Sequence, residues 1–148
     1  IMKILAVDSK HNIGSWLINI FTFSKWNHVA AMFEDSNNLE KYSVIDVTLP
    51  SKVRITSYKE FCTIYPNHEV LDIDIPNEKM AYDFALAQLG KKYDWTGILG
   101  IIFQNRRWEK DDKWFCSELV EAICVAGGKR RFRSDVSAIL PRETYAAL

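Results

Sequence analysis

The sequence lacks the features that mark several common protein classes. Its 148 residues contain only three cysteines, Cys62, Cys116 and Cys124, an odd number without the close spacing of a zinc site or a disulfide framework. Basic and acidic side chains balance to a net charge of zero, which gives no electrostatic reason to expect a nucleic acid or an anionic membrane as partner. We therefore expect neither a metal nor another cofactor, and no nucleic acid.

Long apolar runs and linkers are missing as well. The apolar stretch Ile98–Phe103 is far shorter than a membrane span, and no basic segment with an apolar run and cleavage site opens the chain. No repeat or Pro/Gly/Ser-rich linker divides the sequence. We expect a single domain over residues 1–148, without a transmembrane segment and cytoplasmic by default. The sequence does not indicate an oligomeric state.

The sequence does contain a clear change of pattern, from β-prone segments to helical ones. Strands are predicted at 3–7, 28–33, 42–48, 53–56 and 70–75, the second and third joined as a hairpin by the polar segment 34–38. Helices are predicted at 16–23 after Ser15, at 77–89 up to Gly90, and from Cys116 to the glycines 127–128. This order predicts an α+β fold, with a mainly antiparallel sheet and helices packed on one of its faces.

Cys116 opens the last of these helices, in the run Trp-Phe-Cys-Ser-Glu at 114–118. A thiol in the first turn lies near N–H groups without intrahelical partners and near the positive end of the helix dipole, which favours its thiolate. The thiolate is the nucleophile, a neighbouring imidazole activates it further, and the same N–H groups can stabilise an oxyanion. Taken alone, a cysteine at a helix start is more often a small core residue.

His28 and Asp46 are the candidate partners of this thiol. His28 begins a predicted strand and shares a face with Ala30, whose small side chain we expect to leave room for the cysteine helix. Asp46 interrupts an apolar strand, and a buried carboxylate needs a partner. If the two strands pair, Asp46 can hold the imidazole and fix its tautomer, the third role in a triad. Ordinary strand-edge residues are the alternative for both.

Five motifs in this order resemble the circularly permuted branch of the NlpC-like papain-fold superfamily, which includes YiiX/YebB-like bacterial proteins and, more distantly, lecithin:retinol acyltransferase relatives. In that branch the histidine strand precedes the cysteine helix. The motifs are Ser-Lys-Trp-Asn-His-Val-Ala at 24–30, Val-Ile-Asp-Val at 44–47, Gly-Lys-Lys-Tyr-Asp-Trp at 90–95, Phe-Cys-Ser-Glu-Leu-Val at 115–120 and Pro-Arg-Glu-Thr at 141–144. Many relatives carry Glu where this chain has Asp46.

The resemblance implies a permuted papain-like fold and a thiolate–imidazolium pair. Cys116 is then the nucleophile, His28 the general base and Asp46 the third member of the triad. We also expect substrate-binding or oxyanion contacts from three residues: Tyr93, Ser117 and Trp26. The alternative for Tyr93 is packing under the cysteine helix, and for Ser117 hydrogen bonding at the helix start.

The sequence leaves three functions open. The leading one is a cysteine amidase or peptidase that forms an acyl-enzyme with a small peptide or amide, including the peptides of a bacterial cell wall. The second is a thioesterase, lipase or acyltransferase that uses the same triad on an acyl lipid, with Ile98–Phe103 as an acyl-binding wall; a core helix is the commoner use of such a stretch. The third is a papain-like interaction module without turnover. The rate at which Cys116 is alkylated across pH separates the enzymes from the module.

Overall fold

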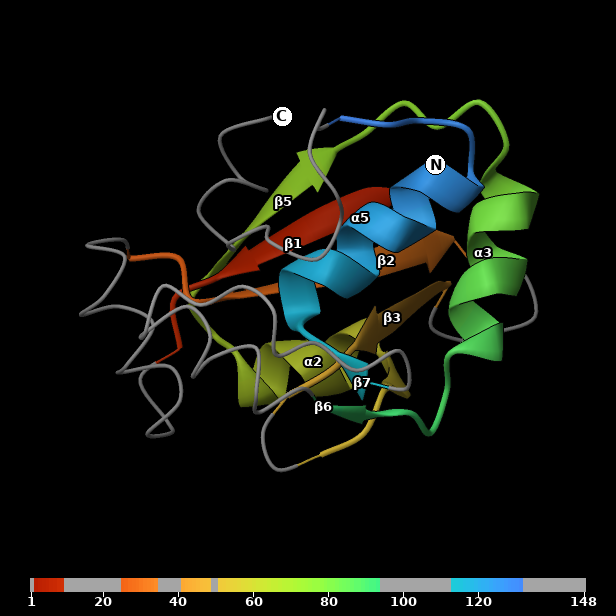
Figure 1. The fold of residues 1–148 in the computed structure, drawn as a ribbon. Coiled ribbons are helices and arrows are strands. Elements are labelled where there is room, and N and C mark those ends of the chain that lie inside the picture. The colour runs from red at the N-terminus through yellow and green to blue at the C-terminus, as the bar shows by residue number, and fades with distance from the viewer. Residues whose placement is uncertain (1, 10–24, 35–40, 49–50, 94–112, 132–148) are drawn as a thin grey trace.

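A five-stranded antiparallel sheet with the strand order β4-β3-β2-β1-β5 forms the centre of the molecule (Figure 1). The structure is a computed structural model that describes residues 2–9, 25–34, 41–48, 51–93 and 113–131. The strands of the sheet are β1 (Lys3–Val7), β2 (His28–Glu34), β3 (Tyr42–Asp46), β4 (Arg54–Ser57) and β5 (His68–Asp72). The helices in these ranges are α2 (Tyr58–Ile64), α3 (Glu78–Ala87) and α5 (Cys116–Ala126). None of them is both long and apolar enough to cross a membrane.

The central strand β2 consists mainly of apolar residues, which suits its position between two other strands. It pairs antiparallel with β1 on one side and with β3 on the other, and every one of its residues except Glu34 is buried. A strand covered on both faces needs apolar residues at consecutive positions rather than at alternate ones. The predicted strand 3–7 and the predicted hairpin are therefore confirmed, and together they fix the position of His28.

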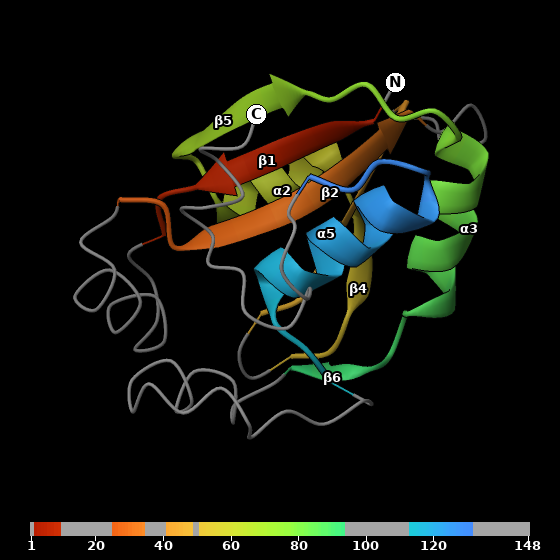
Figure 2. The ribbon, with the colours of Figure 1, turned by 45° about the horizontal axis from the view of Figure 1, so that its top comes forward.

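Helices cover both faces of the sheet, so the prediction of helices on one face is wrong (Figure 2). On one face α5 packs against Val29 and Ala31 of β2. On the other face Phe61 of α2 packs against Ala30 and Met32. Because successive side chains of a strand point to opposite faces, an apolar residue at every position of β2 creates two surfaces that must be covered.

The strand predicted at 42–48 ends at Asp46, and the larger differences between predicted and observed elements lie after β4. Helix α2 was not predicted; it has seven residues and begins after Ser57, whose hydroxyl accepts a hydrogen bond from the N–H of Glu60 (3.2 Å). The strand predicted at 70–75 begins earlier, at His68, and ends at Asp72. Two further predictions, the helix at 16–23 and the motif at 141–144, lie outside the described residues.

Helix α3 lies beside α5 and fixes its far end. It begins after Asn77, whose side-chain oxygen accepts a hydrogen bond from the N–H of Met80 (3.0 Å), as the sequence predicts. The N–H of Asn77 donates to the carbonyl oxygen of Gly127, just past the end of α5 (2.9 Å). Only glycine fits at residue 127, because a Cβ there would collide with the side chain of Ile75. The direction of α5 across the sheet is thus set at its C-terminal end.

A buried ion pair joins the middle of α5 to the segment that follows the helix. Both side chains, Glu121 and Arg131, are almost inaccessible to solvent, and the Arg131 Nη2 and Glu121 Oε2 atoms are 2.8 Å apart. The backbone N–H of Arg131 also donates to Glu121 Oε1 (3.0 Å). Glu121 therefore joins the helix to the segment that leaves it.

We expect the substitution Glu121→Ala to lower the free energy of unfolding by about 3 kcal/mol, because it leaves the buried Arg131 guanidinium without this carboxylate. Urea denaturation followed by circular dichroism measures the loss. The matched control is Asp83→Ala, which breaks the exposed Lys79–Asp83 pair on α3 and is expected to change stability little. Equal, small effects of the two variants would contradict the structural role given to Glu121.

Candidate active site

Three buried polar residues from separate elements meet where β2 and α5 begin. His28 is the first residue of β2, Asp46 the last of β3 and Cys116 the first of α5. Their exposed fractions are 5%, 1% and 2%. The fold brings together side chains that lie far apart in the sequence.

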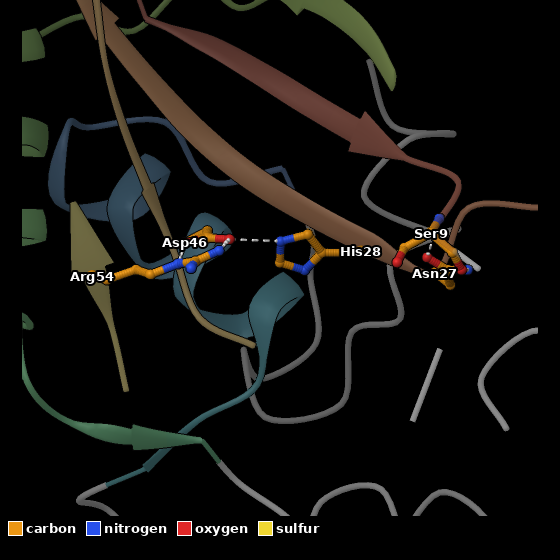
Figure 3. Close-up of polar contacts among 5 residues, drawn as sticks. All are labelled: Ser9, Asn27, His28, Asp46 and Arg54. Atoms are coloured by element: carbon orange, nitrogen blue, oxygen red, sulfur yellow. Dashed lines mark hydrogen bonds and ion pairs between the residues drawn. The ribbon is translucent and has the colours of Figure 1, made fainter. Parts of the chain in front are cut away.

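The imidazole of His28 joins the other two residues. Its Nε2 atom is 3.1 Å from Oδ2 of Asp46 (Figure 3). Because a carboxylate only accepts hydrogen bonds, Nε2 carries the proton and donates it. The side chain of Cys116 also hydrogen-bonds His28, and with Nε2 engaged by Asp46 the ring has Nδ1 left for the thiol. The shorter Asp46, in place of the Glu of many relatives, does reach the imidazole.

Arg54 contacts Asp46 at this site, and the sequence analysis missed it. Its Nε donates to Asp46 Oδ1 (2.8 Å) and its Nη2 to Asp46 Oδ2 (3.3 Å), so the guanidinium contacts both carboxylate oxygens (Figure 3). In the antiparallel register of β3 and β4, Arg54 lies directly opposite Asp46. The signal in the sequence is a pair of opposite charges across a short hairpin, which becomes visible only once the register is known.

The charges at the site depend on these contacts. Burial works to lower the pKa of His28, but the hydrogen bonds with Asp46 and Cys116 outweigh it and raise the pKa well above its ordinary value. Burial likewise works to raise the pKa of Asp46, but the contacts with His28 and Arg54 hold it below its usual range. These contacts therefore favour the charged forms of both side chains, an imidazolium and a carboxylate, and the imidazole also contacts Cys116.

Two further contacts hold the start of β2 in place. The ring of Tyr65, just past the end of α2, lies 5.3 Å from the imidazole ring of His28, measured between centroids. Asn27 accepts a hydrogen bond from the N–H of Ser9 (2.9 Å) and donates one to its carbonyl oxygen (2.6 Å; Figure 3). Asn27 thereby ties the residue before His28 to the end of β1 and limits the movement of the imidazole. Neither contact was predicted from the sequence.

The N-terminus of α5 differs from those of the other two described helices. Ser57 and Asn77 cap α2 and α3 with side-chain oxygens, whereas the residue before α5 is Phe115, which has no such acceptor. Phe115 instead donates its own N–H to Glu118 Oε2 (3.2 Å). The cap residue therefore does not compete for the first-turn N–H groups, the groups suited to bind an oxyanion beside the thiol.

The expectation that Ala30 makes room for the cysteine helix is wrong. Ala30 belongs to the cluster formed with Phe61 and Tyr65, on the face opposite α5. Helix α5 packs against Val29 and Ala31 instead. The contact between His28 and Cys116 forms where the strand and the helix both begin, so it needs no gap in the middle of β2.

The remaining predicted site residues lie close to this region in sequence or structure. Ser117 is fully buried, and Trp26 is nearly so, with Lys25 Nζ 4.1 Å above its ring. Tyr93 belongs to β6 (Lys92–Tyr93), which pairs in parallel with β7 (Lys113–Trp114) and places Tyr93 opposite Trp114. The Gly-x-x-Tyr motif thus runs beside the cysteine motif. Substrate contacts of the three residues stay predictions, and the stretch 98–103 lies outside the described residues.

The other two thiols have different surroundings. Burial raises the pKa of Cys124 to about 11, so this thiol is protonated at neutral pH. Cys62 Sγ is 3.9 Å from Nε2 of His68, but the Nδ1 of that histidine donates to the backbone carbonyl of Tyr65 (2.7 Å) rather than to a carboxylate. Within the described ranges, no three His, Cys, Asp or Glu side chains are grouped so that they could hold a metal ion.

A cysteine at the head of a helix, a histidine on a strand that precedes it in the chain, and a carboxylate on the neighbouring strand together define a papain-like cysteine enzyme in permuted order. Residues 9–131 match a protein family described as permuted papain-like amidase enzymes, YaeF/YiiX, C92 family. The chain belongs to this family, which confirms the predicted fold and the predicted class of enzyme. The comparison with curated proteins gave no match.

Proposed function

We propose that this amidase hydrolyses an amide bond of a small peptide through an acyl-enzyme on Cys116, with His28 as the general base and Asp46 as its orienting partner. The family supports an amidase in general terms. The observation that supports the specific residues is the imidazole of His28, which hydrogen-bonds Asp46 through Nε2 and also hydrogen-bonds the side chain of Cys116.

In the first half of the reaction the Cys116 thiolate attacks the amide carbonyl carbon. The carbonyl oxygen becomes an oxyanion, which the first-turn N–H groups of α5 stabilise. The C–N bond then breaks, and the His28 imidazolium donates its proton to the leaving amine. The products of this half are a thioester on Cys116, a free amine and a neutral imidazole.

In the second half a water molecule hydrolyses the thioester. Neutral His28 accepts a proton from the water as it attacks the thioester carbonyl, and the C–S bond breaks to release a carboxylic acid. The proton returns the site to its imidazolium–thiolate form. Asp46 keeps the imidazole in one tautomer through both halves, because its hydrogen bond fixes the proton on Nε2.

Trapping the acyl-enzyme tests this proposal most directly. We expect a reactive amide or thioester of a short peptide to add its acyl group to Cys116, observed by mass spectrometry of the intact protein and of the peptide that contains residue 116. The added mass also identifies the substrate class, because a peptidyl group and a fatty acyl group differ in mass. The matched control is Cys62→Ala, which is expected to be acylated as the unmodified chain is.

Other outcomes of the experiment would overturn the proposal in different ways. A fatty acyl group on Cys116, with no peptidyl adduct, would favour the thioesterase, lipase or acyltransferase. An adduct on Cys62 but not on Cys116 would contradict the assignment of the nucleophile. No adduct on any cysteine, together with labelling of Cys116 no faster than that of a free thiol, would favour the interaction module.

A further inference from the structure

We propose that Arg54 is a positioning residue of this site, a fourth member that holds Asp46 through both of its oxygens and sets the pH range in which the Cys116–His28 pair is charged. This inference rests on the proposed function, because it assigns Arg54 a role in forming the nucleophile. It adds a residue that the family resemblance does not supply.

The geometry places four groups in a row across three strands and a helix. Arg54 contacts both oxygens of Asp46, at 2.8 and 3.3 Å. Asp46 contacts His28, and His28 contacts Cys116. In the reactive state the charges along the row alternate: guanidinium, carboxylate, imidazolium, thiolate. Each group has an oppositely charged neighbour, the arrangement that charges removed from water require.

Arg54 matters because Asp46 is deeply buried. The side chain of Asp46 has no exposed surface, while that of Arg54 is 31% exposed. A buried carboxylate whose only partner is a histidine loses its positively charged neighbour once the pH rises through the pKa of that histidine. A guanidinium cannot give up its proton in this way, so Arg54 keeps a permanent positive charge next to Asp46.

Among the described residues, the groups that act on Asp46 are His28 of β2 and Arg54 of β4. Cys116 of α5 acts on His28, and Tyr65 and Glu60 from the α2 region act on the guanidinium. Removal of the positive charge of Arg54 makes protonation of each neighbour easier. The sign of the effect on Asp46 and on His28 is therefore the same: each gains its proton at a higher pH.

The test measures the rate at which iodoacetamide alkylates Cys116 across pH, by peptide mapping of the full chain. In Arg54→Met we expect the acidic midpoint of this profile to move up by about 0.5–1 pH unit. The titration of His28, followed by NMR of its imidazole, is expected to move up as well. Arg54→Lys keeps the charge and is expected to lie between Arg54→Met and the unmodified chain. Arg54→Gln is a second neutral variant, should Arg54→Met not fold.

Two further variants serve as controls for the direction of the shift in these midpoints. Asp46→Asn removes the carboxylate and is expected to move the His28 titration down, opposite to Arg54→Met. Lys3→Met breaks the Lys3–Asp72 ion pair between β1 and β5, at the other edge of the same sheet, and is expected to leave both midpoints unchanged.

Three results would overturn the inference. Midpoints unchanged in both neutral variants, with only the melting temperature lowered, would show that Arg54 merely joins β3 to β4. A downward shift of the His28 titration would show that Asp46 leaves the imidazole when Arg54 is lost. Labelling of Cys116 in the unmodified chain at the rate of a free thiol would instead contradict the proposed function itself, so the two failures are distinguishable.

Discussion

Replacement of Cys116 by alanine is expected to lower amide hydrolysis by at least about 1,000-fold, because without its sulfur no acyl-enzyme can form. The measurement is the rate of amine release from the peptide that acylates the unmodified chain, with amounts of folded protein matched by circular dichroism. The side chain of Cys116 belongs to the core between α5 and the sheet, so alanine removes the proposed nucleophile at a small cost in packing.

The matched control for this variant is Cys62→Ala. Cys62 also lies near a histidine, at 3.9 Å, but this histidine has no carboxylate partner on its Nδ1 atom. Hydrolysis by Cys62→Ala is expected to stay within about twofold of the unmodified chain. Should Cys116→Ala retain turnover while Cys62→Ala loses it, the nucleophile would have to be reassigned to α2.

The substitution His28→Ala is expected to slow alkylation of Cys116 by about 100-fold at pH 6 and only slightly at pH 9. A free thiol with a pKa near 8.5 is about 0.3% thiolate at pH 6, and a positive charge beside a thiol makes it react faster at such a pH. Because contacts with Asp46 and Cys116 raise the pKa of His28, its positive charge is present at pH 6. Rates for single cysteines are measured by quenched labelling and peptide mapping.

A histidine outside the site provides the control for His28→Ala. His68→Ala, on β5, is expected to leave the labelling of Cys116 unchanged across the same pH range. If His28→Ala and the unmodified chain were labelled equally fast at pH 6, the pair would not be activated and the interaction module would become the better description.

The raised pKa of His28 also links stability to pH, and the sign can be worked out. The folded pKa lies above the unfolded value of about 6.5, so protonation of His28 favours the folded state. This contribution is complete below about pH 6.5 and disappears as the pH rises through the folded pKa. The stability difference between the unmodified chain and His28→Ala, measured in urea, should therefore shrink as the pH is raised.

Much of the fold was predictable, because apolar residues recur at the spacing of a strand or a helix along its longer segments. The alternation and β-branched residues at 42–46 gave the hairpin, and Asn77 gave the start of α3. Helix α2 was not predictable in this way, since seven residues are too few to establish a helical period. The early start of β5 was missed because the strand is partly exposed and carries no strong apolar alternation.

The residues of the candidate site that could be predicted are those whose reactive side chain is out of place in its local sequence. The helix-start cysteine and the acid within an apolar strand each break a local pattern, and both lie next to His28 in the structure. Arg54 and Tyr65 break no pattern, because an arginine on an edge strand and an aromatic residue after a short helix are ordinary surface and core residues. Their proximity to Asp46 and His28 follows from strand register and from helix packing, which depend on the whole fold.

The two hydrophobic clusters on opposite faces of the sheet have a consequence for how this enzyme would fail. Cys116 belongs to one cluster, and Tyr65, which contacts the imidazole of His28, belongs to the other. A shortened chain that kept the hairpin and α5 but lost α2 would retain Cys116, His28 and Asp46 and would still lack the aromatic contact of Tyr65 with His28. Heat or denaturant that disrupts the packing of either cluster should therefore abolish activity. Loss of activity would then report partial unfolding on either face of the sheet.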